Sequence, residues 1–295
     1  MKWYTPLLYT CAAYALTCFC LKQTDGFTIN AISPSRSPNP PWETRPLNQD
    51  ETKTLACALE QNYSYLGCGG QSFIFISADN NYVIKFFKQR VFEMPLWLRY
   101  VHLPWKLDNY RKKKLWTRQD KLKRDFESYV FSFNELQNHT GVVFVHLGET
   151  NSINKQLTIV DKLGIQHNID LDKMDFLIQK KAVLALDKIA YHMQNQENDL
   201  AKHSIHALVH LIVDRCKQGF HDRDPNIRTN CGFIGENAVK IDVGRFVKDP
   251  RMPSKLIYTS EVKRITHPFK LWLEQHAPSL VDTLDEEIAQ LEDIE

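Results

Sequence analysis

The chain has 295 residues, of which 43% are hydrophobic and 24% charged, with only 11 glycines. This composition excludes collagen-like, coiled-coil and wholly disordered proteins. The length predicts one large domain or two lobes, with enough chain to bury a core without disulfides. The net charge of +2 is unevenly distributed, because residues 85–124 hold 13 Lys and Arg against 3 Asp and Glu. We expect an anionic partner to meet that segment first.

The amino terminus carries an uncharged apolar run from Trp3 to Leu21, flanked by Lys2 and Lys22. Its 19 residues are at the lower limit for spanning a bilayer, and the pattern also suits a cleaved signal peptide. We expect residues 1–23 to be a signal peptide or a membrane anchor, with a buried amino-terminal helix as the alternative. The chain would then be membrane-associated or exported, and the flanking charges leave the side of the membrane open.

Residues 24–50 contain five of the 13 prolines, with Ser, Asn and Thr between them. This composition predicts a flexible tether. Four cysteines lie beyond the apolar run and show no CxxC spacing, so we expect small buried side chains in place of a cysteine zinc site. They are Cys57, Cys68, Cys216 and Cys231.

The chain changes to folded patterns at about residue 51. A short helix is predicted over residues 52–60, and two strands at 63–66 and 72–76 then flank a glycine turn. A third strand follows at 82–87, which gives three antiparallel strands. The later elements of this half are an amphipathic helix over 122–136 and strands at 142–146, 156–161 and 176–179.

The second half of the chain has mainly helical periodicity. Apolar residues line one face of a helix over 200–216, which stops at Gly219, a typical helix-ending residue. A hairpin then joins residues 230–234 to 238–242. Two more helical patterns, at about 260–275 and 279–293, close the chain.

A glycine run lies between the first two predicted strands, in the segment Leu66-Gly-Cys-Gly-Gly-Gln-Ser-Phe73. Missing side chains let backbone amides approach phosphate oxygens, although glycine turns without a ligand are also common. Lys85 stands among apolar residues in the third strand, where an unpaired ammonium group is costly to bury. We expect a phosphate or a carboxylate beside Lys85, or a side chain that reaches the surface from an edge strand.

A loop rich in Asp and Asn follows the long helix, Phe220-His-Asp-Arg-Asp-Pro-Asn-Ile-Arg-Thr-Asn230. Asp242 lies twelve residues beyond Asn230, at the far end of the predicted hairpin. A tight hairpin would bring Asp242 back to Asn230, so that an amide oxygen and a carboxylate could share one hard divalent cation. The alternative is an Asx-rich turn that only caps the hairpin.

The order of these parts resembles the protein kinase-like superfamily, which includes protein kinases and aminoglycoside phosphotransferases, in a divergent bacterial form. The match covers about residues 62–246, and each part is similar to one family motif. These parts are the glycine-rich loop (Gly67, Gly69 and Gly70, with Ser72 in place of the third glycine), the strand lysine (Lys85), the catalytic loop (Asp222, Asp224 and Asn230) and the Asp-Phe-Gly motif (Asp242-Val-Gly244).

The resemblance implies a nucleotide site for ATP and Mg²⁺. Lys85 would hold the α and β phosphates and pair with a helix carboxylate, Glu127 in preference to Glu135, although a solvated Glu127 is the open alternative. Asn230 and Asp242 would bind Mg²⁺.

The resemblance also implies a catalytic aspartate and a hinge. Asp224 would orient or deprotonate the acceptor hydroxyl, and Gln179 would lie in the hinge that meets adenine. The family leaves four residues between the catalytic aspartate and the metal asparagine, whereas Asp224 leaves five before Asn230 and Asp222 leaves seven. Either aspartate could therefore be the catalytic one.

The implied fold is α+β, a two-lobed protein kinase-like fold over residues 51–295. An antiparallel-sheet amino-terminal lobe (51–182) would carry the basic insertion 88–124, and a mostly helical carboxy-terminal lobe would follow (183–295). The implied activity is transfer of the γ-phosphate of ATP to a hydroxyl acceptor. The alternatives are a pseudokinase that serves as a membrane-associated binding module, and a lipid-surface protein indifferent to nucleotide.

The basic insertion interleaves its charges with large aromatic residues. Apolar anchors beside ammonium groups suit an anionic lipid surface, which is the partner that we expect for residues 88–124. Nucleic acid is not expected, because no recognisable binding fold accompanies the segment. A solvated helical hairpin is the alternative.

Overall fold

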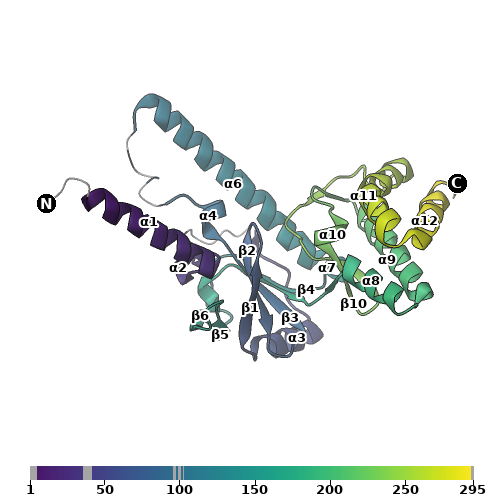
Figure 1. Cartoon of the computed structure of the whole chain (residues 1–295), viewed down its shortest axis with the longest axis horizontal. Coiled ribbons are helices and arrows are strands. Elements are labelled where there is room, and N and C mark those ends of the chain that lie inside the picture. Colours follow the sequence, from purple (N-terminus) through teal and green to yellow (C-terminus); the bar gives the residue numbers. More distant parts are fainter. Residues whose placement is uncertain (1–4, 36–41, 96–97, 99–100, 102, 294–295) are drawn as a thin grey trace. The chain divides into compact units, whose positions relative to one another are not determined.

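The computed structural model describes residues 5–35, 42–95, 98, 101 and 103–293. The chain forms two compact units, the first from residues 1–122 and 144–178 and the second from 123–143 and 179–295 (Figure 1). The first unit carries the large sheet, and the second is mostly helical. The predicted α+β architecture, with a sheet-bearing unit before a helical one, is confirmed.

The first unit is built on a seven-stranded sheet in the order β4-β7-β3-β2-β1-β5-β6. The antiparallel pairing of β1 with β2 and of β2 with β3 confirms the three predicted strands. Strand β6, antiparallel to β5, was not predicted. The strands are β1 (Tyr63–Cys68), β2 (Ser72–Ser77), β3 (Tyr82–Phe87), β4 (Val142–His146), β5 (Gln156–Val160), β6 (Gln166–Asp170) and β7 (Phe176–Lys180).

Alternating side chains explain why this sheet has a buried face. Phe73 and Phe75 of β2 are buried, while the alternate residues Ile74 and Ile76 are only half-buried. Phe75 packs edge-on against Phe86 of β3, with ring centroids 5.9 Å apart, and Phe86 lies 6.0 Å from Phe176 of β7. Burying such large rings stabilises the packing of these strands.

The predicted tether differs from expectation, because its described part packs against the sheet. Phe27 lies edge-on to Phe73 and Phe75, with centroids 5.2 and 5.4 Å away, and Ile32 and Trp42 are buried as well. The prolines of this segment disfavour regular secondary structure, which is why a tether was predicted, but its few apolar side chains are enough to pack against the sheet. Residues 36–41 of the predicted tether lie outside the described residues.

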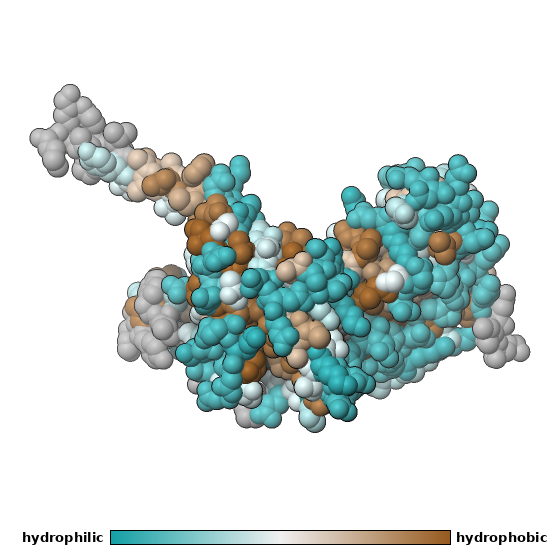
Figure 2. Space-filling view, turned by 90° about the horizontal axis from the view of Figure 1, so that it is seen from below, coloured by the Kyte–Doolittle hydropathy of each residue, from teal (hydrophilic) through white to brown (hydrophobic). Residues whose placement is uncertain are grey.

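The helices of the first unit include α1 (Thr5–Thr24), α2 (Ile29–Ile32), α3 (Gln49–Leu59) and α4 (Gln89–Phe92). Asn48 and Glu51 form a reciprocal capping box that explains why α3 begins where it does. Large apolar side chains along α1 are exposed (Figure 2). Within the described residues, no helix combines the length and the apolar character needed to cross a membrane.

Helix α6 (Trp105–Asn134) is longer than the helix predicted over 122–136, because most of the basic insertion is helical too. Residues 105–122 belong to the first unit and residues 123–134 to the second. The apolar residues of the later part, such as Phe126 and Phe133, are buried at helical spacing.

The second unit has a core formed largely by α9 (Asn198–Lys217), which ends before Gly219 as predicted. The predicted hairpin is confirmed as β10 (Cys231–Ile234) and β11 (Asn237–Lys240), and the two closing helices as α11 (Lys255–His276) and α12 (Val281–Asp293). The unit also contains α7 (Gln137–Thr140), β8 (Val183–Leu184), α8 (Ala185–Gln194), β9 (Phe220–Asp222), α10 (Ile227–Asn230) and β12 (Phe246–Lys248).

The cysteine prediction holds for two of the four residues. Cys216 and Cys231 are buried, and burial raises the pKa of the Cys231 thiol to about 11. Cys57 and Cys68 are exposed, so the prediction of buried side chains is wrong for them. Cys57 lies at an exposed position of α3, and Cys68 is the last residue of β1, at the glycine turn.

Candidate functional site

The glycine turn between β1 and β2 is an open loop, and neither its backbone conformation nor its packing requires glycine. Gly67, Gly69 and Gly70 have no left-handed φ, and a Cβ atom added to any of them would meet nothing within 4 Å. The Gly69 amide donates to the Ser72 carbonyl at 2.9 Å and closes the turn. The backbone between β1 and β2 is therefore accessible to a ligand.

Lys88, which was not predicted to be a functional residue, supports this turn. Its Nζ donates to the Gly69 carbonyl at 2.6 Å and lies 4.6 Å from the centre of the Phe73 ring. Only 4% of Lys88 is exposed. A buried ammonium thus lies directly beneath the loop.

Lys85 occupies the predicted place in the middle of β3, opposite Ile74 of β2, and is half-buried. Glu127 is 43% exposed and forms an ion pair with Lys123 on its own helix, at 4.0 Å. Glu135 pairs with Lys248 at 2.9 Å. The pairing of Lys85 with a helix carboxylate stays a prediction.

The buried carboxylate of α6 in the second unit is Asp125, two residues before Glu127. It is 1% exposed, and its Oδ1 lies 3.5 Å from a guanidinium nitrogen of Arg245. Burial, with the charge of Asp125 nearby, raises the pKa of the buried Tyr129 well above its usual range. Helical periodicity could have revealed Asp125, which adjoins Phe126 on the buried face.

A single helical turn, α10, lies within the Asp- and Asn-rich loop and accommodates the extra residue between Asp224 and Asn230. The Asn226 side chain accepts a hydrogen bond from the Arg228 amide at 3.0 Å and begins α10. The turn returns Asn230, whose Nδ2 donates to the Asp224 carbonyl at 3.1 Å. Asn230 and Asp224 therefore meet although five residues separate them.

The two candidate aspartates occupy opposite environments. Asp222 is 1% exposed, with Oδ2 2.6 Å from Lys240 Nζ and 3.4 Å from Arg215 Nη1. Asp222 also accepts a hydrogen bond from the Asp224 amide at 2.9 Å. The backbone of Asp224 is held in place because its carbonyl accepts hydrogen bonds from the side chains of Asn230 and Lys240. Asp224 as a whole is nevertheless exposed.

The hairpin register brings the two predicted metal ligands to one place. Cys231 pairs with Lys240, and the Ile241 amide donates to the Asn230 carbonyl at 2.7 Å. Asn230 therefore lies opposite Ile241, one residue from Asp242. Asn230 is buried and Asp242 is exposed.

Helix α6 fixes the segment that follows Asp242. The Ser128 hydroxyl donates to the Val243 carbonyl at 2.5 Å and accepts from the Phe246 amide at 2.7 Å. Tyr129 lies so close to Gly244 that a Cβ there would stand 3.1 Å from its hydroxyl. The Asp242 carboxylate is thus presented by a rigid turn.

Gln179 lies at the end of β7 and is 1% exposed. Its amide donates to the Thr140 carbonyl at 2.5 Å and to the Lys240 carbonyl at 3.0 Å. The side chain therefore connects α7 to β11, and a hinge role for this residue stays a prediction.

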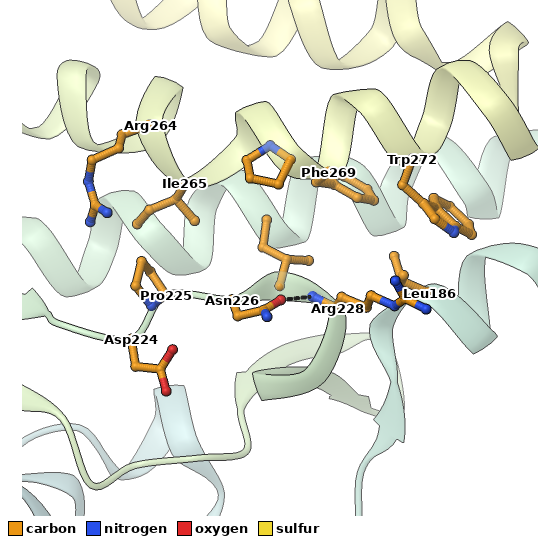
Figure 3. Close-up of a pocket in the computed structure, with 11 residues that line it drawn as sticks. Leu186, Asp224, Pro225, Asn226, Arg228, Arg264, Ile265, Phe269 and Trp272 are labelled. Carbon is orange, nitrogen blue, oxygen red and sulfur yellow. Dashed lines mark hydrogen bonds between the residues drawn. The ribbon is translucent and has the colours of Figure 1, made fainter.

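A cavity of about 410 Å³ opens beside Asp224, wholly within the second unit (Figure 3). Asp224 lies on one side and apolar residues of α11 on the other. Phe269 and Trp272 stack with ring centroids 6.2 Å apart and planes 13° apart. Arg228 and Arg264 also line the cavity, and the Arg264 guanidinium donates two hydrogen bonds of 2.9 Å to the Glu261 carboxylate.

No known family profile matches the chain, and no curated protein matches it. Among solved structures, the chain is similar to the bifunctional kinase-methyltransferase WbdD, with TM-scores of 0.37 and 0.35 in two structures. These comparisons give 15% and 18% identity, and cover 80% and 77% of this chain but 47% and 45% of those chains. The chain thus spans about half the length of WbdD.

A further solved structure is the complex of Rv3197 from Mycobacterium tuberculosis with erythromycin. Its TM-score is 0.33 at 12% identity, and the match covers 95% of this chain and 74% of that one.

Proposed function

We propose that the chain is a phosphotransferase that uses ATP and Mg²⁺ and transfers the γ-phosphate to a hydroxyl acceptor. The convergence of Asp224, Asn230 and Asp242 at one end of the β10–β11 hairpin carries this proposal. The open glycine turn and Lys85 of the first unit are the groups that we assign to the nucleotide phosphates.

The residues at the hairpin fit a magnesium ion. Asn230 donates through Nδ2 to the Asp224 carbonyl, and its amide oxygen accepts a hydrogen bond from the Thr229 hydroxyl at 2.9 Å. An amide oxygen has two lone pairs, so one remains for a metal ion. Asp242 contributes an exposed carboxylate on a fixed turn. Amide and carboxylate oxygens are hard ligands of the kind that Mg²⁺ prefers, and bound Mg²⁺ would neutralise charge on the nucleotide phosphates.

Asp224 is the aspartate that we assign to the acceptor. In the transfer, the acceptor oxygen forms a bond to the γ-phosphorus as the bond from that phosphorus to the β–γ bridging oxygen breaks, and ADP leaves. Asp224 orients the hydroxyl and takes its proton, which then passes to solvent. Asp222 is ill suited to this role, because Lys240 and Arg215 occupy its carboxylate.

The cavity beside Asp224 suggests the class of acceptor. Stacked Phe269 and Trp272 would bind a planar or apolar body, while Arg228 at the rim would favour an acceptor with an anionic group. The acceptor that fits is a small hydroxyl compound with these two features.

We expect ATP with Mg²⁺ to raise the unfolding temperature of the full chain by several degrees. A ligand at 100 times its Kd that binds only the folded state contributes about 2.7 kcal/mol. Asp242→Asn should remove most of this rise without changing the unfolding temperature of the free protein, because Asp242 is exposed. Differential scanning fluorimetry at millimolar nucleotide measures both.

A glycine pair supplies the matched control for this experiment. Gly70→Ala should leave the free protein unchanged and reduce the rise with nucleotide, because its Cβ enters only open space above the turn. Gly141→Ala should destabilise the free protein but keep the nucleotide response, since φ is +64° and the Cβ would lie 2.5 Å from Ile234 Cδ1. A wild-type chain that shows no shift would contradict the proposal.

We also propose that the early part of α6 binds an anionic membrane surface, as the basic insertion predicts. Trp105 and Trp116 are 75% and 67% exposed, and Lys112, Lys113 and Lys114 lie exposed between them. Indole rings and ammonium groups on one short helical segment suit the interface of an anionic bilayer.

The chain should sediment with phosphatidylserine vesicles less strongly as salt is increased, because each basic residue near the surface contributes about 1 kcal/mol. Trp116→Ser should weaken this binding, whereas Tyr191→Ser, at a position that is 60% exposed on α8, should not. Vesicle binding that is equal in high and low salt would count against α6 and assign the interaction to the apolar helix α1.

A further inference from the structure

Helix α9 carries a strip of histidines on the side away from the core. His203, His206 and His210 are exposed at spacings of three and four residues, which place them on one helical face. The core side of the same helix is formed by buried apolar residues such as Leu208 and Ile212. None of the three histidines takes part in the phosphotransfer site.

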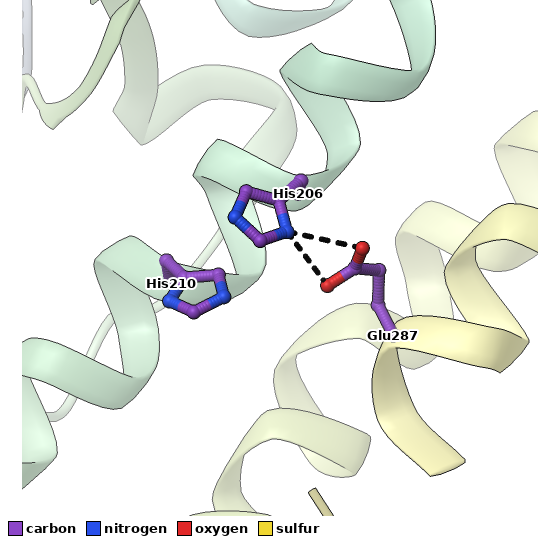
Figure 4. A group of neighbouring side chains, drawn as sticks. All are labelled: His206, His210 and Glu287. Carbon is purple, nitrogen blue, oxygen red and sulfur yellow. Dashed lines mark hydrogen bonds and ion pairs between the residues drawn. The ribbon is translucent and has the colours of Figure 1, made fainter. Parts of the chain in front are cut away.

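Glu287 of α12 points at this strip (Figure 4). Its two carboxylate oxygens each lie 3.0 Å from His206 Nδ1. The Glu287 side chain is only 16% exposed and that of His206 46%. The carboxylate is thus directed between the two helices and toward the imidazole.

His210 completes a three-residue cluster. Its ring centre lies 4.0 Å from that of His206, and one ligand atom from each of His206, His210 and Glu287 lies within 4.8 Å of the others. Around a tetrahedral zinc ion, ligand atoms at about 2.0–2.1 Å from the metal stand about 3.3–3.4 Å apart. Small rotations of exposed side chains would close the remaining gap.

We propose that His206, His210 and Glu287 bind a divalent metal ion of the zinc class that joins α9 to α12. Two imidazoles at i and i+4 present their nitrogens to one point, and the carboxylate adds a charged oxygen from a second helix. Imidazole nitrogen favours zinc and its transition-metal neighbours over Mg²⁺, which distinguishes this site from the oxygen ligands Asn230 and Asp242.

The site would hold the last helix of the chain against α9. Without metal, α12 is held by apolar packing of Leu284 and by surface ion pairs such as that of Asp285 with Lys270 at 2.7 Å. Three protein ligands leave a coordination position to solvent on the exposed side. Metal binding would therefore stabilise this helix pair independently of nucleotide.

The test is a titration of the full chain with Zn²⁺ and with Co²⁺ in a background of millimolar Mg²⁺. We expect one equivalent of Zn²⁺ to bind and to raise the unfolding temperature. Co²⁺ should give visible absorption bands of a four- or five-coordinate site without the near-ultraviolet band of thiolate ligation. The latter readout separates the site from the exposed cysteines.

Variants then assign the ligands. His210→Gln and Glu287→Gln should each weaken Zn²⁺ binding at least tenfold, whereas His203→Gln, which changes the adjacent histidine of the strip, should retain it. Asp242→Asn should also retain it, so that failure of the zinc site and failure of the nucleotide site are separable. Zn²⁺ binding that survives in His210→Gln, or absence of saturable binding in the wild type, would overturn the proposal.

Discussion

Asp224→Asn is expected to slow phosphoryl transfer by about 10²–10⁴-fold, the usual contribution of a general base. The free energy of unfolding should change by no more than about 0.5 kcal/mol, because the Asp224 carboxylate is exposed and its structural contacts are made by the backbone. Release of ADP from ATP in the presence of Mg²⁺ measures the rate, and chemical unfolding measures the stability.

Nucleotide binding is the control for this variant. Asp224→Asn should keep the thermal response to ATP and Mg²⁺ that Asp242→Asn loses, since Asp224 acts on the acceptor. A variant that releases ADP at the wild-type rate would remove Asp224 from the mechanism. A wild-type chain that binds nucleotide but releases no ADP with Mg²⁺ or Mn²⁺ would instead support the pseudokinase alternative.

The elements that the sequence predicted well are those with a local cause. Strand alternation around Phe73 and Phe75 and the apolar stripe of α9 follow from side-chain periodicity, and the hairpin after Asn230 follows from its turn residues. The convergence of Asn230 with Asp242 was predictable for the same reason, because a tight hairpin has only a few registers.

The features that the sequence did not reveal depend on tertiary pairing. Lys88, Asp125 and Lys240 are charged residues that are buried beside partners distant in sequence, and no local pattern names those partners. The sequence feature that could have revealed these three residues is the one used for Lys85, namely a charged residue among the apolar residues of a strand or helix. The choice between Asp222 and Asp224 likewise required the buried cations around Asp222.

Asp222→Asn is expected to destabilise the chain by about 3–5 kcal/mol, the usual cost of removing one partner from a buried ion pair. Arg215, Asp222, Lys240 and Glu261 are all less than 10% exposed and together hold two positive and two negative charges. Lys240 lies 2.6 Å from Asp222, and Arg215 lies 3.4 Å from Asp222 and 3.5 Å from Glu261. Removing one carboxylate leaves two buried cations with a single anion.

A charge-balanced double variant separates this electrostatic cost from lost packing. Asp222→Asn combined with Lys240→Met removes one charge of each sign and leaves the pair of Arg215 with Glu261, so it should recover part of the lost stability. Urea unfolding of wild type, both single variants and the double variant gives the coupling energy. If Asp222→Asn costs less than about 1 kcal/mol, the Asp222 carboxylate does not carry the charge balance of the loop, and the assignment of the catalytic role to Asp224 in preference to Asp222 would reopen.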